Sequence, residues 1–588
     1  MQNAVNLRDG IPSFEATLSR IAGGESVCST ELLPYIFLER PDDREKANRL
    51  LAEAYFKSGR KEDLLYARTF VQRAWLLGRF SADLLPLYIQ IHSALDDVPA
   101  IREAYKRLGI GAATRGDVSG AITYFDRWQY AYMEFKRLDR FEYDFDILDA
   151  MHRLAQPDRL RPKSRRDLLK SGKIRVAYLV KGITEVGSVL IKVILLFARY
   201  HDRSRFEPMF FVPESERDVL ASEAGPEHIR QFEQCGYKVA MAPSIGGTHE
   251  QLRAVARTIY KQRADVLVTS GALTQFQHYY IMSLRPAPIV VGLVQGPPPQ
   301  FASPRLDGGL AWSKHPLIDT PVSCVWTPLG NDLPERDKIT PHERRELGIP
   351  DHARVVASSG RYVKFQEPRF WQAIVELLHE FPEMYYLVMG PEESQIPIVS
   401  DVLTPESRAR IRFLSWRGDS YLKALCLAEV LIDTFPSGGG GALLDALALG
   451  IPSVSFENDY MRLYDQTDWS LADELINIPE LIVPRWDFER MKRTVAHLLG
   501  NETYRRDIAR RSQAYVLETR GNPKLSVRKC EDAYVRLIEQ KLFGGSGHET
   551  GNEHIKRLNW VPPRWFAGAA LQFKRALRFG VRVLDRIS

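Results

Sequence analysis

The sequence predicts an α/β protein in which two Rossmann-like domains face each other and an all-α domain precedes them. Two observations lead to this fold class. Apolar residues recur at helical spacing from about residue 12 to 155, and after about residue 173 two series of short β-branched runs alternate with helical stretches. A third observation is a turn of four glycines, 438–441, between a strand candidate and a helical stretch. A chain of 588 residues has room for about two to four domains.

The composition is that of an ordinary globular protein and excludes several classes. The formal net charge is +6 and no zinc-finger or aromatic-basic RNA motif accompanies it, so we expect no nucleic-acid partner. The five cysteines include no C-x-x-C pair, which indicates neither a disulfide framework nor a zinc site and fits a reducing cytosol. We find no signal peptide at the N-terminus and no run near the roughly 18 apolar residues of a membrane span. We therefore expect a cytoplasmic protein.

The first domain, residues 1–156, is predicted to be helical and to contain repeats. One segment follows the spacing of a tetratricopeptide repeat, in which small residues let two helices cross closely: Leu108-Gly109, Ala112, Gly116-Asp117, Ala121-Ile122 and Phe125. A looser copy consists of Leu51-Ala52, Tyr55, Gly59, Ala67 and Ala74. Such repeats typically bind peptides or proteins. An unspecialised helical bundle is the alternative.

A proline- and arginine-rich linker, residues 157–172, leads into the first Rossmann-like domain, residues 173–340. The strand candidates of that domain are the runs Ile174–Val180, Met209–Val212, Lys238–Met241, Val266–Thr269 and Ile289–Val294. Helical stretches separate the earlier ones, which predicts a parallel sheet with crossover helices.

The second Rossmann-like domain is predicted over residues 341–542. Its strand candidates are Val355–Ser358, Tyr385–Met389, Ile411–Leu414, Val430–Asp433 and Ser453–Phe456. Ligands of such sheets lie at the carboxyl ends of the strands. Three turns follow strands there and are expected to line one side of a shared cleft: Ser358-Ser359-Gly360, Gly390-Pro391 and the four glycines.

The four-glycine turn is the most informative feature for function. Glycines at a strand-to-helix turn let backbone N–H groups approach an anion, and the helix N-terminus adds about half a positive charge. Asp445 lies one turn into the helix that follows and could accept hydrogen bonds from sugar hydroxyls. The pattern predicts a site for a nucleotide diphosphate. The alternative is a glycine-rich loop that only permits close packing.

The C-terminal region is predicted to have two parts. Residues 543–559 are rich in glycine and polar side chains and read as a flexible linker. Residues 560–588 are predicted to form a basic amphipathic helix, whose apolar face consists of Phe566, Phe573, Leu577, Leu584 and Ile587. Such a helix suits an anionic membrane surface and would place the protein at the inner face of the membrane. Docking on the protein's own body is the alternative.

Three blocks of sequence carry a family resemblance. The first runs from Ala287-Pro288-Ile289-Val290-Val291 to Gly296-Pro297-Pro298 and Leu306-Asp307, and the second is Gly360-Arg361-Tyr362-Val363-Lys364-Phe365. The third runs from Leu427 through the four glycines to Asp445. Together with the order of the domains, these blocks resemble the O-GlcNAc transferase/SPINDLY family. Its members join tetratricopeptide repeats to a GT-B glycosyltransferase, which consists of two facing Rossmann-like domains.

The resemblance implies a donor site in the second domain. Lys364 would contact the donor's diphosphate, and the N–H groups of Gly439–Ala442 would stabilise the charge that develops there. A solvated surface lysine is the alternative for Lys364. Trp416 follows a strand candidate and could stack on the base, with core packing as the alternative. The expected donor-binding residues are Ser359, Gly360, Arg361, Lys364, Trp416, Pro436, Ser437, Gly438, Gly439, Gly440, Gly441, Ala442 and Asp445.

No Asp-x-Asp motif of the metal-dependent kind is present, so we expect no metal and no cofactor besides the nucleotide-sugar donor. The family commonly carries hydroxyl or histidine side chains where this chain has Gly440, Gly441 and Ala442. Phosphate contacts would then come from the backbone.

The acceptor side departs from the family as well. The loop 181–188 lacks the histidine that is usual there. Glu185 of this loop is a candidate general base if burial raises its pKa, and a plain loop carboxylate is the alternative. His278 and His315 are further possibilities. The residues expected on the acceptor side of the cleft are Gly187, Gln295 and Gly296.

The sequence thus predicts a metal-independent glycosyltransferase with Lys364 and Glu185 as its catalytic residues. The donor would be a nucleotide-sugar, most simply a UDP-sugar, and the acceptor a protein held by the helical domain. Two alternatives stay open. If the tail binds membrane, a lipid-linked glycan or polysaccharide becomes the acceptor. If the bare glycine loop binds no donor, the chain is a glycosyltransferase-like scaffold.

Overall fold

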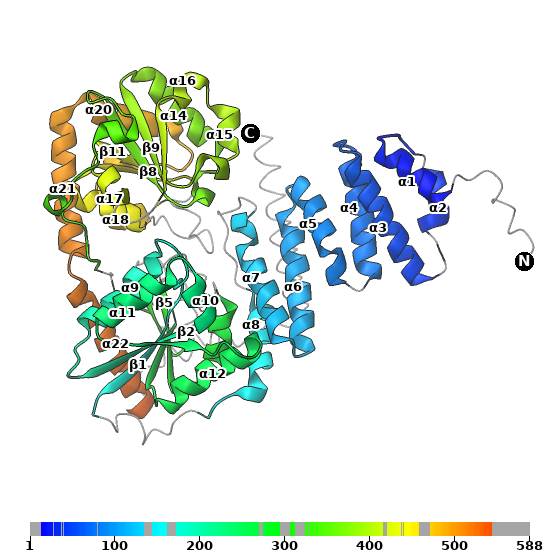
Figure 1. Ribbon diagram of the computed structural model, residues 1–588, viewed down its shortest axis with the longest axis horizontal. Coiled ribbons are helices and arrows are strands. Elements are labelled where there is room, and N and C mark those ends of the chain that lie inside the picture. Colours follow the sequence, from blue (N-terminus) through cyan, green and yellow to red (C-terminus); the bar gives the residue numbers. More distant parts are fainter. Residues whose placement is uncertain are drawn as a thin grey trace, which may run out of the picture.

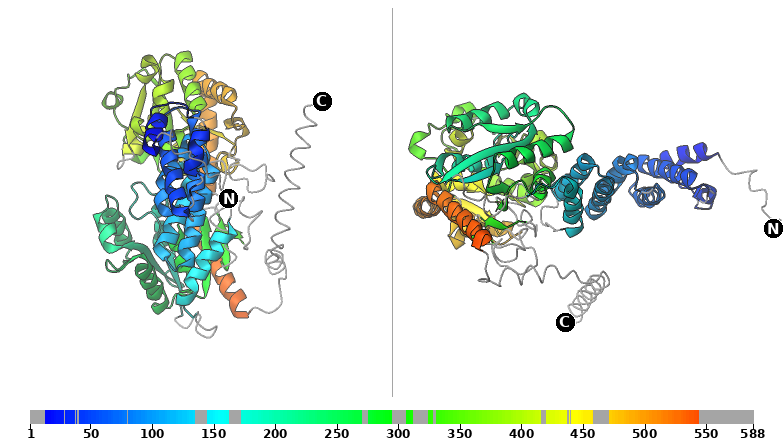
Figure 2. Two further views of the ribbon diagram at one scale, coloured as in Figure 1. Left: turned by 90° about the vertical axis from the view of Figure 1, so that its right-hand side faces the viewer. Right: turned by 90° about the horizontal axis from the view of Figure 1, so that it is seen from below.

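The structure is a computed structural model in which two α/β domains lie one above the other and a helical domain extends to one side (Figures 1 and 2). It describes residues 13–27, 29–36, 38, 40–78, 80–134, 144–161, 172–269, 275–294, 306–311, 324–327, 330–415, 420–436, 438, 440–457 and 471–543.

The helical domain consists of antiparallel helical hairpins. Its helices are α1 (Phe14–Ala22), α2 (Ser29–Ile36), α3 (Pro41–Lys57), α4 (Asp63–Leu77), α5 (Leu85–Ala94), α6 (Val98–Thr114), α7 (Val118–Glu134) and α8 (Phe145–Ala155). The two repeat-like segments fall on the hairpins α3–α4 and α6–α7. In the second hairpin the helices cross closely, because a Cβ on Gly109 would lie 2.4 Å from the ring of Phe125. The predicted helical region is confirmed, and the assignment to tetratricopeptide repeats stays a prediction.

One Asp-x-Asp spacing does occur in this domain, and it has a structural role. The side chain of Asp144 accepts from the backbone at the start of α8. Lys106 on α6 pairs with Asp144 at 2.5 Å and with Asp146 at 3.1 Å. These carboxylates therefore cap α8 and tie it to α6.

The first α/β domain is built on a seven-stranded sheet of order β3-β2-β1-β4-β5-β6-β7. All neighbouring strands recorded in it are parallel. The strands are β1 (Ile174–Leu179), β2 (Phe206–Ser215), β3 (Val239–Ala242), β4 (Val266–Thr269), β5 (Ile289–Val294), β6 (Gly308–Ala311) and β7 (Cys324–Trp326). The helices between them include α9 (Val189–Tyr200), α10 (Glu216–Ala221), α11 (Gly225–Gln234), α12 (Thr248–Lys261) and α13 (Phe276–Ser283).

Sequence analysis predicted the first five of these strands and missed the last two. Strand β6 begins with two glycines, which disfavour strands. The structure shows why one is there, since a Cβ on Gly308 would lie 2.8 Å from a methyl carbon of Leu537. Strand β7 has only three residues, too few to show alternation.

The second α/β domain has a parallel six-stranded sheet of order β10-β9-β8-β11-β12-β13. Its strands are β8 (Arg354–Ser359), β9 (Met384–Gly390), β10 (Ile411–Ser415), β11 (Val430–Ile432), β12 (Ser453–Phe456) and β13 (Ile482–Val483). Its helices are α14 (Pro368–Glu380), α15 (Ile398–Val402), α16 (Pro405–Arg408), α17 (Ser420–Leu425), α18 (Gly441–Ala448), α19 (Leu471–Ile476), α20 (Phe488–Gly500) and α21 (Glu502–Arg520). The five predicted strands are present, and the two-residue β13 was not foreseen.

The last described helix, α22 (Pro523–Phe543), returns to the first domain (orange in Figure 1). Its apolar side is buried in the core of the first sheet through Val527, Cys530, Ala533, Tyr534 and Ile538. The predicted domain boundary, which assigned 341–542 to the second domain, is therefore wrong for this helix. An amphipathic pattern shows that a helix buries one face, but it does not show which sheet covers it.

Buried polar groups hold α22 in place. The carboxylate of Glu531 accepts from His201 Nδ1 at 2.8 Å and from the backbone N–H of Asp202 at 2.8 Å. The hydroxyl of Tyr178 on β1 lies 2.7 Å from His201 Nε2 and 3.2 Å from the Tyr534 hydroxyl. Burial lowers the pKa of His201, which keeps the imidazole neutral in this network.

The helical domain and the first sheet share one hydrophobic core. Buried residues of α6, α7 and α8 belong to the same cluster as residues of β1, β4, α12 and α13. At the centre of this junction the rings of Phe125 and Phe276 lie 5.3 Å apart. The position of α7 beside the first sheet is therefore held by core packing.

Two further expectations concern membrane-spanning helices and the C-terminal region. No helix in the described part of the chain is long and apolar enough to cross a membrane. The predicted linker 543–559 and tail helix 560–588 lie outside the described residues, apart from Phe543, which ends α22.

Gly109 and Gly111 on α6 provide a matched test of the close helix crossing. Gly109→Ala would place a Cβ against the Phe125 ring, so we expect the variant to lose about 1–3 kcal/mol of stability. Gly111→Ala meets its nearest atom, Arg115 Nη1, at 3.4 Å and should be neutral or gain up to about 1 kcal/mol. Thermal unfolding followed by circular dichroism measures both. Equal destabilisation by the two changes would contradict the crossing.

Candidate functional site

The carboxyl edges of the two sheets meet at the starts of two helices. Helix α9 begins at Val189 in the first domain, and α18 begins at Gly441 in the second. A Cβ built on Gly441 would lie 3.5 Å from a Val189 methyl carbon, so the first residues of the two helices lie close together across the domains. The positive ends of two helix dipoles near one another would favour an anion there.

The four-glycine turn divides into glycines with different tasks. A Cβ on Gly438 would lie 2.4 Å from the carboxylate of Asp433, so this glycine permits close packing. Gly440 is exposed, has φ +97°, and would meet no described atom within 4 Å of a Cβ. The close-packing explanation therefore holds for Gly438, whereas Gly440 borders open space at the start of α18.

The buried carboxylate of Asp433 organises this turn. It accepts from its neighbour's backbone, the Thr434 N–H, at 2.8 Å and from the Ser455 hydroxyl at 2.7 Å. Sequence analysis treated Asp433 only as the end of a strand. Its hydrogen bonds link the turn after β11 to β12.

Lys364 lies beside the same turn. It is on a short 3-10 helix, Tyr362–Phe365, that follows β8. Gly360 permits its approach, because a Cβ there would lie 2.8 Å from Thr434 Cγ2 and 3.2 Å from Lys364 Cδ. Burial lowers the pKa of Lys364 and Arg361 adds to that effect, while the charge of Asp433 opposes it. A partly buried lysine between two loops at a carboxyl edge differs from a solvated surface lysine.

Asp445 lies one turn into α18, and residues of both domains affect its pKa. Burial raises its pKa to about 6, while Lys192 of the first domain and the hydroxyl of Tyr421 act in the opposite direction. The Tyr421 hydroxyl is near Ser359 as well as Asp445, yet it is buried and has no well-formed hydrogen bond within the described residues. A ligand hydroxyl would satisfy both groups.

The structure brings most of the predicted donor residues to this edge. These are Ser359, Gly360, Arg361, Lys364, Pro436, Gly438, Gly440, Gly441, Ala442 and Asp445. Gly187 lies across from them, in the loop before α9. Trp416, Ser437, Gly439, Gln295, Gly296 and His315 lie outside the described residues.

The structure adds residues that sequence analysis did not select. Lys192 and Tyr421 approach Asp445 from different elements, α9 and α17, so no spacing along the chain relates them to it. The hydroxyl of Ser188, the residue before α9, is buried without a hydrogen-bond partner among the described residues. A polar group without a partner at a helix N-terminus is a further sign of a ligand site.

The two described acid–base candidates, Glu185 and His278, differ in burial. Glu185 is exposed, so the burial that would make it a general base is not present. His278 on α13 is fully buried, and burial together with the charge of Lys181 lowers its pKa to about 3. His278 is therefore neutral at physiological pH.

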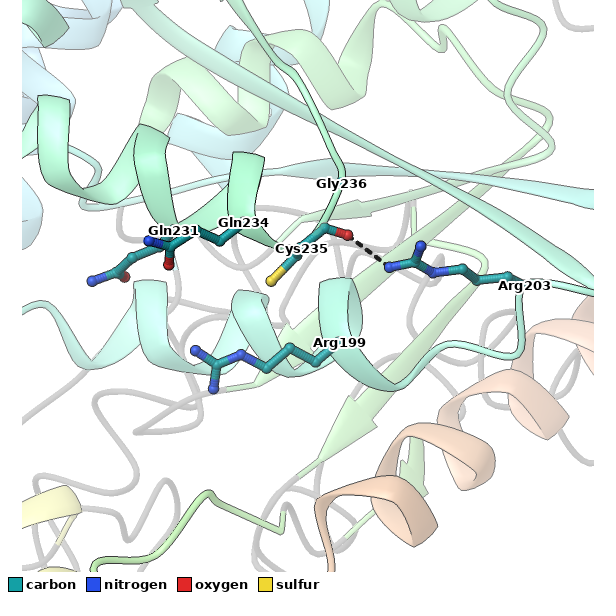
Figure 3. A pocket seen from close by; sticks show the side chains of 6 residues that line it. All are labelled: Arg199, Arg203, Gln231, Gln234, Cys235 and Gly236. Carbon is teal, nitrogen blue, oxygen red and sulfur yellow. Dashed lines mark hydrogen bonds between the residues drawn. The ribbon is translucent and has the colours of Figure 1, made fainter.

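A separate pocket of about 570 Å³ lies at the far end of α9 (Figure 3). It is lined by Arg199, Arg203, Gln231, Gln234, Cys235 and Gly236. Arg203 donates to the Cys235 carbonyl at 2.7 Å, and Arg199 pairs with Asp332. Both α9 and α11 end here, and helix C-termini disfavour anions. We therefore do not assign the donor site to this pocket.

Comparisons with known proteins agree with this arrangement. A solved structure of an O-GlcNAc transferase variant from Thermobaculum terrenum matches 91% of this chain and 100% of its own, with 16% identity and a TM-score of 0.53. Two D-inositol 3-phosphate glycosyltransferases, from Corynebacterium efficiens and Corynebacterium glutamicum, are 34% and 33% identical over 131 residues. Each of those matches spans 21% of this chain and only 31% of the relative. No family model matches the chain. The structural likeness confirms the expected fold, two Rossmann-like domains in the GT-B arrangement behind a helical domain.

The raised pKa of Asp445 predicts a trade-off between stability and ligand binding. The native state holds this proton up to about pH 6 and the unfolded chain only to about 3.8, so ionisation destabilises the fold as pH rises between these values. We expect Asp445→Asn to be more stable than wild type at pH 7.5, by about 1–3 kcal/mol, with the difference shrinking toward pH 5. Melting temperatures across this pH range test it, with exposed Asp351→Asn as the control. A pH-independent difference would contradict the assignment.

Proposed function

We propose that the chain is a glycosyltransferase that binds a nucleotide-sugar between the carboxyl edges of its two sheets. The observation that carries the proposal is the close approach of the first residues of α9 and α18, Val189 and Gly441, together with Lys364 at the carboxyl edge of the second sheet. Two helix N-termini and a lysine suit a diphosphate, which carries two or more negative charges. The local sequence likeness to glycosyltransferases supports the same class of reaction.

The chemistry follows from where charge develops. When the sugar leaves, the bond between its anomeric carbon and the diphosphate oxygen breaks, and the electron pair stays on the diphosphate. Lys364 and the N–H groups at the start of α18 would stabilise that charge without reorganising, which is the main source of catalysis in such sites. Burial lowers the pKa of Lys364, so its ammonium is poorly solvated. An anionic ligand beside it would stabilise the charged form.

Asp445 and Tyr421 would bind the nucleoside. Their carboxylate and hydroxyl lie near each other and near Ser359, and ribose offers two hydroxyls that can donate to the one and accept from the other. Lys192 would then face this group from the first domain. We propose a UDP-sugar as donor on the strength of the family resemblance.

For the acceptor we propose a protein. The helical domain shares its core with the first sheet, so a polypeptide held on its hairpins would be presented to that side of the site. The lipid or polysaccharide alternative depends on the tail, which lies outside the described residues. The scaffold alternative requires a filled donor site, whereas within the described residues no atom lies within 4 Å of a Cβ built on Gly440, which supports a binding site instead.

Lys364→Met tests the donor site, because methionine keeps an unbranched side chain of similar length and removes the charge. We expect the nucleotide-sugar that stabilises the wild-type protein to give a smaller rise in melting temperature with this variant. At 100 times its dissociation constant a ligand adds about 2.7 kcal/mol, and loss of one charge-assisted contact removes on the order of 2 kcal/mol of affinity. Exposed Lys338→Ala serves as the control.

The screen uses UDP-, GDP-, dTDP- and CMP-sugars in thermal-shift measurements. The nucleotide-sugar that raises the melting temperature of the wild type and of Lys338→Ala equally identifies the donor class. If no nucleotide-sugar shifts the melting temperature of the wild type, the glycosyltransferase proposal fails and the scaffold alternative gains.

A further inference from the structure

A polar cluster lies where the helical domain meets the carboxyl edge of the first sheet. Its members come from four elements: Lys181 after β1, Glu214 in β2, Asp126 on α7 and His278 on α13. The charge of Lys181 acts on the pKa of each of the other three. The donor site described above uses none of them.

Lys181 is nearly buried, with 7% of its surface exposed. Its ammonium donates to the hydroxyl of Tyr130 on α7 at 3.2 Å and lies 5.9 Å from the centre of that ring. In Figure 1 helix α7 runs along the side of the first domain toward the level of the second. Tyr130 of the helical domain therefore fixes the Lys181 ammonium at the edge of the first sheet.

The two carboxylates of the cluster differ in their hydrogen-bond partners. Asp126 accepts from the backbone N–H of Phe276 at 2.9 Å, which ties α7 to the start of α13. Glu214 Oε2 is buried and has no hydrogen-bond partner among the residues that the structure describes. Asp126 is thus explained by its structural bond, and Glu214 is not.

Glu214 is surrounded by charges of both signs. Burial raises its pKa to about 7; its own backbone N–H and Lys181 oppose the shift, and Glu185 and Asp218 add to it. The charge of Lys181 also lowers the pKa values of Asp126 and His278, and the pKa of Asp126 is likewise raised to about 7 by burial. A buried carboxyl group whose pKa lies near neutral and whose Oε2 has no hydrogen-bond partner among the described residues is a candidate general base.

The loop 181–188 connects this cluster to the donor site. Glu185 of the loop acts on Glu214, and a Cβ on Gly182 would lie 2.4 Å from the Ser188 hydroxyl, so the loop folds tightly on itself. The next residue, Val189, lies close to Gly441 of the donor loop, since a Cβ built on Gly441 would be 3.5 Å from a Val189 methyl carbon. Glu214 therefore lies on the same edge as the donor site, on the side of the helical domain.

We propose that Glu214 is the general base that takes the proton of the acceptor hydroxyl. This inference rests on the proposed glycosyltransferase function and replaces Glu185 as the candidate base. The acceptor oxygen forms a bond to the anomeric carbon, the bond from that carbon to the diphosphate breaks with its electron pair leaving on the diphosphate, and the acceptor proton passes to a Glu214 carboxylate oxygen. Burial raises the pKa of the Glu214 carboxyl, and the charge of Lys181 opposes that shift.

Glu214→Gln tests the base without changing its shape. With the nucleotide-sugar that stabilises the wild type, we measure kcat and KM for sugar transfer to water as nucleotide release between pH 5.5 and 8.5. The wild-type rate should rise with pH through an apparent pKa of about 7. The variant should lose that limb and about 10²–10⁴-fold in kcat, with the donor KM unchanged. Glu207→Gln on the same strand, an exposed carboxylate paired with Arg175, is the control.

Glu185→Gln distinguishes the two candidate bases. Removal of this negative neighbour should lower the apparent pKa of the rise in rate with pH, because Glu185 raises the pKa of Glu214. The rise itself should persist. If Glu185→Gln abolishes the limb and Glu214→Gln keeps it, the proposal is overturned and the original prediction of Glu185 holds.

A second measurement separates this inference from the proposed function. Because burial raises the pKa of Glu214 to about 7, its ionisation costs stability as pH rises from about 4.5 to 7, so Glu214→Gln should become more stable relative to wild type across that range. An unchanged pH dependence of the melting temperature would overturn the proposal whatever the activity. If the wild type binds and turns over no nucleotide-sugar, the glycosyltransferase function fails, and with it the role of Glu214 as a base, even where the stability measurement shows that it titrates.

Discussion

The return of α22 to the first domain is the constraint on which the arrangement of the site depends. The chain builds the first sheet, then the second, and then places its last described helix back on the first. The carboxylate of Glu531 lies 2.8 Å from His201 and from a backbone N–H, deep in the core, where an unpaired polar group would be costly. Two connections therefore link the domains, the segment after β7 and the path from α21 to α22, and both limit how the carboxyl edges can face each other.

Burial also controls the charges at these edges. Lys364, Asp445, Glu214 and Asp126 all have pKa values displaced toward the neutral form, and burial is the largest cause in each case. Displaced values of this kind gather at functional sites, because structures selected only for stability avoid them. Here Lys364 and Asp445 belong to the donor site in the second domain, whereas Glu214 of the first domain and Asp126 of the helical domain form the acid–base group.

The glycines show how one sequence signal contains several physical causes. Four consecutive glycines predicted an anion site, and the structure separates a packing glycine, Gly438, from Gly440, which has a left-handed backbone and borders open space. Gly360 has a third cause, since a Cβ there would lie 2.8 Å from Thr434 Cγ2 and 3.2 Å from Lys364 Cδ. None of these distinctions is visible in the sequence, because each depends on a neighbour that another strand provides.

The sequence by itself determined the fold class, most of the strands, and the position of the donor turn. These follow from local rules, since apolar periodicity defines strands and helices and the carboxyl ends of parallel strands must share one edge. Only the tertiary structure decided that α22 belongs to the first sheet, that Lys192 and Tyr421 approach Asp445, and that Glu185 is exposed while Glu214 is enclosed. Those facts depend on burial and on contacts between distant segments, and a single sequence records neither.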